Sequence, residues 1–288
     1  MSRTWRRRLA AAALLTPSLA VLIVFFMIPS AGLIRLSLAR IDPQLAIQYD
    51  VSLGNYRTFV TSPYYRGMVL GSVKLTAYTT LLCLLLGYPA AHYMIHVRSN
   101  RYRTVLYAIV VSPLLISVIV RTFGWVVLLA NNGVINGLLI MTGLASQPVR
   151  MLGTFGSVLV ATVHVLLPFM ILPIASALQS LDPALERAAA SLGASPTQAF
   201  WRVTLPLSMP GVMAGITLVV ALTLGIYITP LLVAGPLQPL LAIGIYYVTL
   251  NQLNFPMGAA LSLILLVFTL LLLGGVGRLL GGKHGDTA

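Results

Sequence analysis

Six long apolar runs limit most strictly how this chain can fold. They cover approximately residues 9–38, 68–94, 105–130, 152–178, 211–233 and 257–280. A helix needs about 20 apolar residues to cross the hydrocarbon of a bilayer, and each run reaches that length. Only 8% of the 288 residues are charged, whereas an average soluble domain carries about 25%. The sequence therefore predicts an all-α integral membrane protein with six transmembrane helices.

The residues before the second run divide into a basic start, an anchor and a polar loop. The first run is too long for a signal peptide and lacks a small-x-small exit, so we expect an uncleaved anchor. Residues 1–8 then form a basic N-terminus, and residues 9–288 form one transmembrane domain. Tyrosines accumulate in residues 41–67, which predicts a folded external loop at the membrane interface.

The distribution of Lys and Arg predicts the orientation. Eleven of these residues flank the side that holds both termini: Arg3, Arg6, Arg7, Arg8, Arg98, Arg101, Arg103, Arg187, Arg202, Arg278 and Lys283. The flanks on the opposite side hold Arg40, Arg57, Arg66 and Arg150. Because cytoplasmic loops carry the excess of positive charge, we expect both termini in the cytoplasm.

Residues 182–210 stand apart because they mix charged and apolar residues between two apolar runs. Asp182 is a good N-cap and Pro183 suits the first helical position. Gly193 is the residue type that follows a helix end. The apolar positions between them recur at helical spacing, which gives this short helix one apolar face: Leu185, Ala188, Ala189 and Leu192.

A second short helix follows the glycine. Ser195 and Gln198 have the spacing of a capping box, and Pro206 with Pro210 is expected to end the helix. The pattern predicts a helix-turn-helix hairpin on the cytoplasmic side. One interpretation is an amphipathic loop that only packs on its own membrane helices.

The hairpin also resembles the signature of permease subunits of ABC importers, which reads E-A-A, three residues, G, nine residues, then I-x-L-P. The residues in register are Ala188, Ala189, Gly193, Val203, Leu205 and Pro206. The chain departs from the signature at the glutamate. With Gly193 aligned, that position holds Arg187, and the acid lies one residue earlier at Glu186.

The resemblance continues along the chain from about Gly67. Residues 121–139, 167–183, 225–236 and 255–262 are similar to spermidine/putrescine-type permeases, in the same order. This family implies a type I ABC importer permease fold in a bacterial inner membrane. It further implies a second permease subunit in a heterodimer, an ATPase dimer that carries ATP and Mg, and a periplasmic solute-binding protein. The chain itself would hold no cofactor and would be no enzyme.

The resemblance also assigns a coupling role to the hairpin. The candidate ATPase-coupling residues are Glu186, Arg187, Ala188, Ala189, Gly193, Phe200, Leu205 and Pro206. The small face at Ala188 and Ala189 would seat in an ATPase groove, with Phe200 and Trp201 anchoring the second helix. Closure of the ATPase pair would then move the fourth and fifth spans as levers.

Polar groups inside the spans are candidates for the translocation path, because such groups are costly in a bilayer. They are Lys74, Arg121, His164, Thr223, Tyr227 and Thr229. Simpler interpretations remain for two of them. Lys74 can extend its stem towards the interface, and His164 can be a buried, hydrogen-bonded residue. The predicted spans contain no carboxylate.

Three further features argue against a nucleotide-binding protein, a disulfide-rich protein and a nucleic-acid-binding protein. Gly277, Gly282 and Lys283 have phosphate-loop spacing, but His284 replaces the required Ser or Thr and no strand precedes them. Cys83 is the one cysteine, which excludes a disulfide framework. The net charge of +13 is spread over loop ends, so it indicates orientation in a bilayer and no nucleic-acid partner.

The sequence leaves the driving force and the solute open. An ion-gradient-driven secondary transporter is the alternative, although it would call for an intramembrane acid or a half-helix site in paired repeats. The solute is expected in the polyamine, opine, amino-acid-derivative or phosphonate class. Related permeases often carry an acid where this chain has Ile226. Because Lys74 and Arg121 would repel a polyamine, we expect a solute with at least one negative group.

Overall fold

The computed structural model describes residues 16–17, 19–42, 46–235 and 238–281. The basic start at 1–8 and Lys283 of the phosphate-loop-like stretch lie outside these ranges. Within the described ranges, six helical segments are long and apolar enough to cross a membrane: Leu19–Ser37, Pro63–His96, Val118–Met141, Phe155–Gln179, Pro196–Gly225 and Phe255–Gly275. The prediction of an all-α protein with six spans is confirmed.

The chain divides into two compact units. Unit 1 contains residues 1–63 and 245–266. Its elements are η1 (Ile23–Met27), α2 (Ile28–Ser37), β1 (Arg40–Ile41), β2 (Ile47–Gln48), α3 (Gly54–Thr61), η3 (Tyr247–Asn251) and the first part of α14 (Phe255–Gly281).

The predicted external loop at 41–67 has a defined structure in unit 1. β1 pairs with β2 in an antiparallel ribbon in which Arg40 lies opposite Gln48. The Asn55 amide donates to the carbonyl oxygens of Ser37 and Ala39 at 2.9 and 3.0 Å. These bonds satisfy carbonyl groups at the end of α2 and hold α3 against it.

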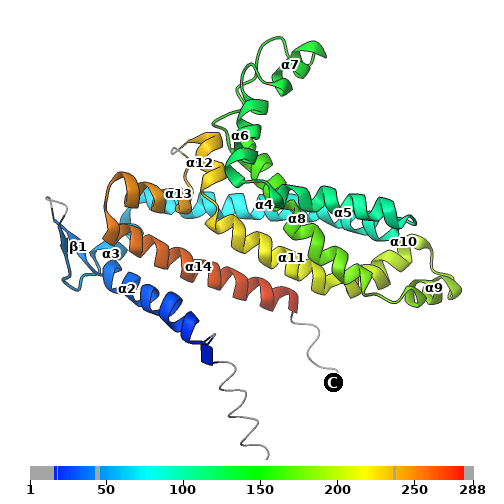
Figure 1. The fold of residues 1–288 in the computed structure, drawn as a ribbon, viewed down its shortest axis with the longest axis horizontal. Helices are drawn as coiled ribbons and strands as arrows, with labels where there is room; N and C mark the ends of the chain where they lie inside the picture. The colour runs from blue at the N-terminus through cyan, green and yellow to red at the C-terminus, as the bar shows by residue number, and fades with distance from the viewer. Residues whose placement is uncertain (1–15, 18, 43–45, 236–237, 282–288) are drawn as a thin grey trace, which may run out of the picture. The chain divides into compact units, whose positions relative to one another are not determined.

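Unit 2 contains residues 64–244 and 267–288. Its elements are α4 (Pro63–His96), α5 (Asn100–Leu115), α6 (Val118–Leu129), α7 (Val134–Met141), α8 (Phe155–Gln179), α9 (Pro183–Ser191), α10 (Pro196–Ala199), η2 (Phe200–Thr204), α11 (Leu205–Gly225), α12 (Ile228–Ala234) and most of α13 (Leu241–Tyr246). In Figure 1, α9 and α10 lie at the end of unit 2 where α4 finishes and α5 begins. We call this the hairpin end.

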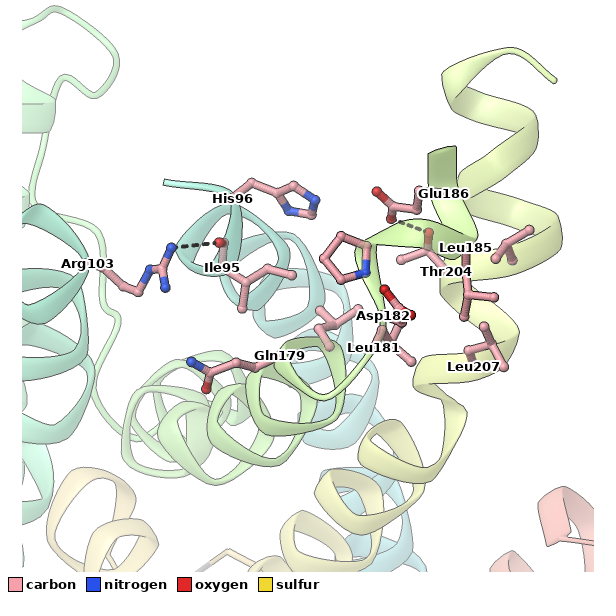
Figure 2. A pocket seen from close by; sticks show the side chains of 13 residues that line it. Ile95, His96, Arg103, Gln179, Leu181, Asp182, Leu185, Glu186, Thr204 and Leu207 are labelled. Carbon is pink, nitrogen blue, oxygen red and sulfur yellow. Dashed lines mark hydrogen bonds between the residues drawn. The ribbon is translucent and has the colours of Figure 1, made fainter. Parts of the chain in front are cut away.

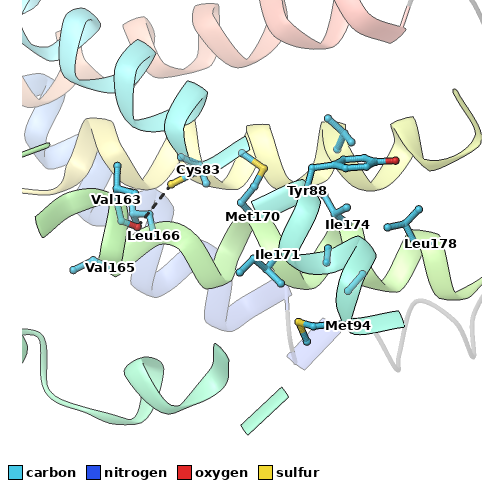
Figure 3. Packing of buried hydrophobic residues seen from close by; sticks show 14 residues of the cluster. Cys83, Tyr88, Met94, Val163, Val165, Leu166, Met170, Ile171, Ile174 and Leu178 are labelled. Atoms are coloured by element: carbon cyan, nitrogen blue, oxygen red, sulfur yellow. Dashed lines mark hydrogen bonds between the residues drawn. The ribbon is translucent and has the colours of Figure 1, made fainter. Parts of the chain in front are cut away.

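The core of unit 2 is the contact between α8 and α11. Met170 and Ile174 of α8 are fully buried there, and Cys83 of α4 joins the same cluster (Figure 3). Gly211 and Gly215 let the two backbones approach closely. A β-carbon at Gly211 would collide with Ala177 and the Pro173 carbonyl, and one at Gly215 would lie 2.7 Å from the Met170 sulfur. Small residues four apart are a common device for close helix packing in membranes.

The predicted third span at 105–130 is wrong as a single helix. Helix α5 ends at Leu115, and α6 starts at Val118 after two extended residues. The break removes the backbone N–H that would have bonded the Pro113 carbonyl. The Arg121 side chain donates to this carbonyl instead, and a cation at a helix C-terminus also complements the helix dipole.

The predicted fifth span at 211–233 is also interrupted. Helix α11 ends at Gly225, the next residue Ile226 is extended, and α12 begins at Ile228. Pro230 supplies the physical reason, because it lacks the N–H that a continuous helix would direct to Ile226 and its ring would clash there.

At its other end the fifth span runs further than predicted. Pro206 and Pro210 do not end the second hairpin helix, because α10, η2 and α11 form one continuous helical segment from Pro196 to Gly225. The π-helical turn η2 ends at Thr204, two residues before Pro206. Such a turn shifts the backbone bonding by one residue, and this shift accommodates the missing N–H of the proline.

Candidate functional site

Helix α9 is the first part of the hairpin, and its own residues fix both of its ends. The Asp182 side chain accepts a bond from the Ala184 N–H at 2.8 Å, as an N-cap does. Gly193 has a φ of +87°, the left-handed conformation in which glycine is favoured. The Ala194 N–H then bonds back to the Ala189 carbonyl at 3.0 Å. The turn is therefore defined without help from the membrane spans.

The second hairpin helix starts with a complete capping box. The Ser195 hydroxyl accepts from the Gln198 N–H at 3.3 Å, and the Gln198 side chain accepts from the Ser195 N–H at 2.9 Å. This helix continues through η2 into α11, so the second hairpin helix and a candidate membrane span form one helical segment.

Glu186 and Arg187 are neighbours in sequence but face different surroundings. The Glu186 carboxylate accepts a hydrogen bond from the Thr204 hydroxyl at 2.7 Å, as Figure 2 shows. Thr204 is only 3% exposed. Arg187 is exposed, and among the described residues its guanidinium has no hydrogen-bond or ion-pair partner. Glu186 thus joins the two hairpin helices, whereas Arg187 is available to a partner.

Two cavities flank this hydrogen bond. One has a volume of about 310 Å³ and reaches from Arg103 at the start of α5 to Glu186 (Figure 2). The other has about 770 Å³ and opens between α9, α10 and the last turns of α4. The hairpin therefore has open space on both sides of the bond between its two helices.

The apolar face of α9 is left open. Leu192 is 89% exposed and Leu185 is 44% exposed. Ala188 is exposed and Ala189 half-buried, and no residue of α9 is buried. An amphipathic loop that only packed on its own helices would bury this face. The exposed face argues against that interpretation.

Phe200 of the predicted coupling set packs against α4. Its ring makes edge-to-face contacts with Tyr88 at 5.7 Å and His92 at 5.6 Å, both on α4. Trp201 beside it is 62% exposed. Leu205 is half-buried against the core, and Pro206 is exposed. Phe200 therefore fastens the hairpin to α4, and Trp201 is the aromatic ring that faces outward.

Arg121 and His164 of the predicted translocation path are tied to their own unit. The Arg121 guanidinium donates to Pro113, as described above, and its Nε is buried without a partner among the described atoms. His164 accepts a hydrogen bond from the Trp125 indole N–H at 3.1 Å. Both side chains are half-buried.

The other predicted path residues make contacts of their own. Thr229 is buried and lies 3.1 Å from Thr122, which joins α12 to α6. Thr223 donates to the Val219 carbonyl of its own helix at 2.6 Å. The Lys74 ammonium lies 4.9 Å from the centre of the Phe155 ring.

Tyr227 is 37% exposed, between α11 and α12. The contacts described for Arg121, His164, Thr229, Thr223 and Lys74 are all with residues outside the set of six.

Sequence reasoning missed the partners of these groups. Thr204, Trp125 and Thr122 each complete a contact with a predicted residue. Tyr88 and Ser208, which lie 2.8 Å apart and join α4 to α11, were also missed. The available signal was a polar or amphipathic residue inside an apolar run. This signal does not predict which residue such a side chain contacts in the folded protein.

The six candidate spans and the capped hairpin outside the apolar runs indicate a multi-pass membrane protein. Residues 83–279 match the family model of the binding-protein-dependent transport system inner membrane component, and the chain belongs to this family. It is accordingly a non-catalytic permease subunit of a binding-protein-dependent ABC importer, and a multi-pass inner-membrane protein.

Curated relatives cover most of the chain. The spermidine/putrescine transport system permease protein PotB of Haemophilus influenzae is 36% identical over 88% of this chain and 87% of its own length. Its Escherichia coli counterpart is 32% identical over 85% and 89%. The chain is also 32% identical to the E. coli inner membrane ABC transporter permease protein YdcU, over 83% of this chain and 79% of that protein.

The solved structures support the predicted fold. A bacterial ABC transporter involved in the import of the acidic polysaccharide alginate superposes with a TM-score of 0.77. The alignment covers 99% of this chain and 100% of that one, at 21% sequence identity. The type I ABC importer permease fold is thereby confirmed.

Proposed function

We propose that this subunit takes its motion from a separate ATPase dimer through the hairpin at 182–210, and passes it to α8 and α11. The observation that carries the proposal is the exposed apolar face of α9 on a helix whose two ends are both capped. A short helix with fixed ends and an uncovered apolar face fits a docking element. Glu186 and Phe200 link this element to the spans, so that it moves with them.

The orientation follows from the same proposal. The hairpin faces the cytoplasm, where ATP is available, which agrees with the excess of Lys and Arg on its side. Both chain termini are then cytoplasmic as well. A second permease subunit pairs with this one in a heterodimer, and ATP and Mg belong to the ATPase subunits. A periplasmic binding protein delivers solute from the other side, and one alginate-transporter structure contains such a protein.

We propose a small polar organic solute of the polyamine, opine, amino-acid-derivative or phosphonate class. The relatives named for spermidine and putrescine support the first of these. The six candidate spans contain no Asp or Glu, and their basic residues are Arg35, Arg66, Lys74, Arg121 and Arg202. A path with this balance disfavours a multivalent cation unless the partner permease supplies acids. Within the class we therefore favour a solute that carries at least one negative group.

Two measurements on the reconstituted complex test these proposals. Solute-stimulated ATP hydrolysis should require the intact hairpin, and uptake should persist when a protonophore abolishes the ion gradient. Uptake that follows the ion gradient and ignores ATP would instead support a secondary transporter. For the solute, uptake should be competed by an anionic or zwitterionic compound and be insensitive to excess spermidine. Tight spermidine binding by the cognate binding protein, with spermidine-stimulated ATP hydrolysis, would overturn the proposed charge.

A further inference from the structure

Arg121 carries a positive charge inside a candidate span, and the described part of the chain gives it no counter-ion. It lies in α6, within the span Val118–Met141, and none of the six candidate spans contains Asp or Glu. Its guanidinium donates to the neutral Pro113 carbonyl, and its Nε is buried without a partner among the described atoms. Because a charge in a low-dielectric setting is costly unless an opposite charge meets it, we expect an anion from outside this chain at Arg121.

Trp125 holds His164 beside this arginine. Arg121 and Trp125 are four residues apart on α6, so they lie on the same face of the helix. The Trp125 indole N–H donates to Nδ1 of His164 on α8 at 3.1 Å, and the two rings meet edge to face with their centres 5.5 Å apart. Arg121 lies near enough to act electrostatically on the His164 ring. The cation and the imidazole are therefore neighbours where α6 contacts α8.

The hydrogen bond from Trp125 determines which nitrogen of His164 carries the proton. An indole N–H can only donate, so Nδ1 of His164 must accept. The ring is then neutral, and its proton is on Nε2. Within the described part of the chain, Nε2 has no hydrogen-bond partner. His164 thus presents a fixed N–H donor next to the guanidinium.

Both donors lie deep in the candidate spans and keep some exposed surface. Arg121, Trp125 and His164 are each half-buried. His164 is the tenth residue of α8, so at 1.5 Å per residue it lies about 14 Å along the helix from Phe155. This half of α8 is the one away from the hairpin end. The two donors are therefore placed where a solute that crosses the membrane can reach them.

We propose that Arg121 and His164 bind the acidic head group of the transported solute, a carboxylate or a phosphonate, and that Trp125 is the positioning residue of this pair. The guanidinium neutralises the charge of the head group. The His164 Nε2–H donates a second hydrogen bond to one of its oxygens. The inference rests on the proposed function, in which the solute carries a negative group, and it names the residues that recognise that group.

The chemistry of the pair selects an acid over other ligands. A polyamine brings only N–H donors, and both Arg121 and the Nε2 of His164 are donors in this arrangement. A neutral carbonyl would accept a hydrogen bond but leave the charge of Arg121 unpaired. An acid supplies acceptor oxygens together with the negative charge, which gives the stronger, charge-assisted bond. An acid of the partner permease is the other source of such an anion, and it would occupy the pair permanently.

The first experiment determines the tautomer of His164 by nuclear magnetic resonance. The importer is assembled with nitrogen-15 only in the histidine rings of this subunit, and the His164 signals are those that disappear in His164→Gln. We expect the Nε2–H tautomer in the native protein and a mixture of tautomers in Trp125→Phe. A Nδ1–H tautomer in the native protein would overturn the arrangement on which the proposal depends.

The second experiment titrates the same labelled importer with methylphosphonate, acetate and putrescine at constant ionic strength. The two acids should shift the His164 signals, and putrescine should leave them unchanged. Arg121→Gln should weaken the binding of the acids at least tenfold, because a charge-assisted bond is lost. Arg150→Gln is the matched control at an exposed arginine outside the candidate spans, and it should change the affinity by less than about twofold. Equal losses in both variants would show a general effect of charge and would contradict the proposal.

A pair of His164 variants separates recognition from a merely structural role. The subunit is labelled with fluorotryptophan, and the Trp125 fluorine signal follows the methylphosphonate titration. A glutamine can accept from Trp125 through its oxygen and donate through its nitrogen, so His164→Gln should bind within about threefold of the native affinity. His164→Phe lacks the donor and should bind about tenfold more weakly. Equal affinities of the two variants would remove His164 from the site, and thermal unfolding confirms that each variant is folded.

The outcomes also separate this inference from the proposed function. If neither acid shifts the His164 signals, the solute does not bind there, and a permanent acid of the partner permease is the better account. Uptake that is competed by anionic compounds without any response at His164 would then leave the proposed function standing and remove only this site. Spermidine-stimulated ATP hydrolysis, together with a shift of the His164 signals by putrescine, would remove both.

Discussion

The polar groups of the hairpin and those inside the spans obtain their hydrogen-bond partners in different ways. In the hairpin the polar groups of the backbone are capped locally, by Asp182 and Ser195, and an apolar face is left open. Inside the spans some polar side chains find partners across the fold, as Trp125 does with His164 and Thr122 with Thr229. Exposed apolar surface is unremarkable in the bilayer, but it marks a docking surface outside it. For a membrane subunit, the informative exposure therefore lies beyond the ends of the spans.

The largest effect on stability is expected at the close contact between α8 and α11, the helices that connect the two regions. Gly211→Leu forces a side chain into Ala177 and the Pro173 carbonyl, and such overpacking costs about 1–3 kcal/mol or more. The thermal unfolding temperature of the purified protein should fall steeply. Gly274→Leu is the matched control, because nothing lies within 4 Å of a β-carbon at that glycine. Equal stability of the two variants would show that this close contact does not hold the unit together.

Two glycines in the left-handed conformation, one inside the hairpin and one outside it, allow a direct comparison of the same substitution in the two regions. Gly193 and Gly143 have φ of +87° and +73°, and both face open space. A valine in that conformation costs about 1–2 kcal/mol at either position. We expect Gly193→Val to lower transport and solute-stimulated ATP hydrolysis on the order of tenfold, with insertion unchanged. Gly143→Val, outside the hairpin, should keep ATP hydrolysis coupled to solute. Normal transport by Gly193→Val would remove the hairpin from the mechanism.

Cross-linking probes the hairpin surface at residue resolution. Single cysteines at Ala188 and Ala189, in a Cys83→Ala background, are paired with a cysteine in the ATPase groove. Because Ala188 is exposed and Ala189 half-buried, the yield should be higher at Ala188 and should change with ATP. Free labelling of both positions from the cytoplasm while the ATPase is bound would show that this face is not the docking surface.

The smallest effect is expected inside the spans. Trp125→Phe removes the hydrogen bond to His164 and keeps most of the aromatic volume. The free energy of unfolding should fall by about 0.5–1.5 kcal/mol, while ATPase binding stays unchanged. Trp201→Phe, at a residue that is 62% exposed, should leave stability unaltered. A loss of ATPase binding by Trp125→Phe would mean that the two regions are coupled.

The sequence predicts the hairpin well because its determinants are local. Asp182, Gly193, Ser195 and Gln198 act over three or four residues, so their spacing is visible in the chain. The number of spans is visible for a similar reason, because each depends on the length of one apolar run.

The helix breaks and the tertiary contacts could not be predicted in this way. The interruption after Leu115 depends on Arg121 reaching back to Pro113, and the role of Glu186 depends on Thr204, eighteen residues later. The prolines at 206 and 210 are ambiguous, because a proline ends a helix in water but is tolerated in a span beside a π-helical turn.

The central claim is that the open apolar face of α9 is where the ATPase binds. Leu192→Asp places a charge on this face, at a side chain that is 89% exposed, and Leu144→Asp makes the same change at one that is 78% exposed outside the hairpin. The measurement is the affinity of each purified permease for its ATPase. We predict a loss of at least tenfold, about 1.4 kcal/mol, for Leu192→Asp and wild-type affinity for Leu144→Asp. Wild-type affinity for Leu192→Asp would contradict the claim.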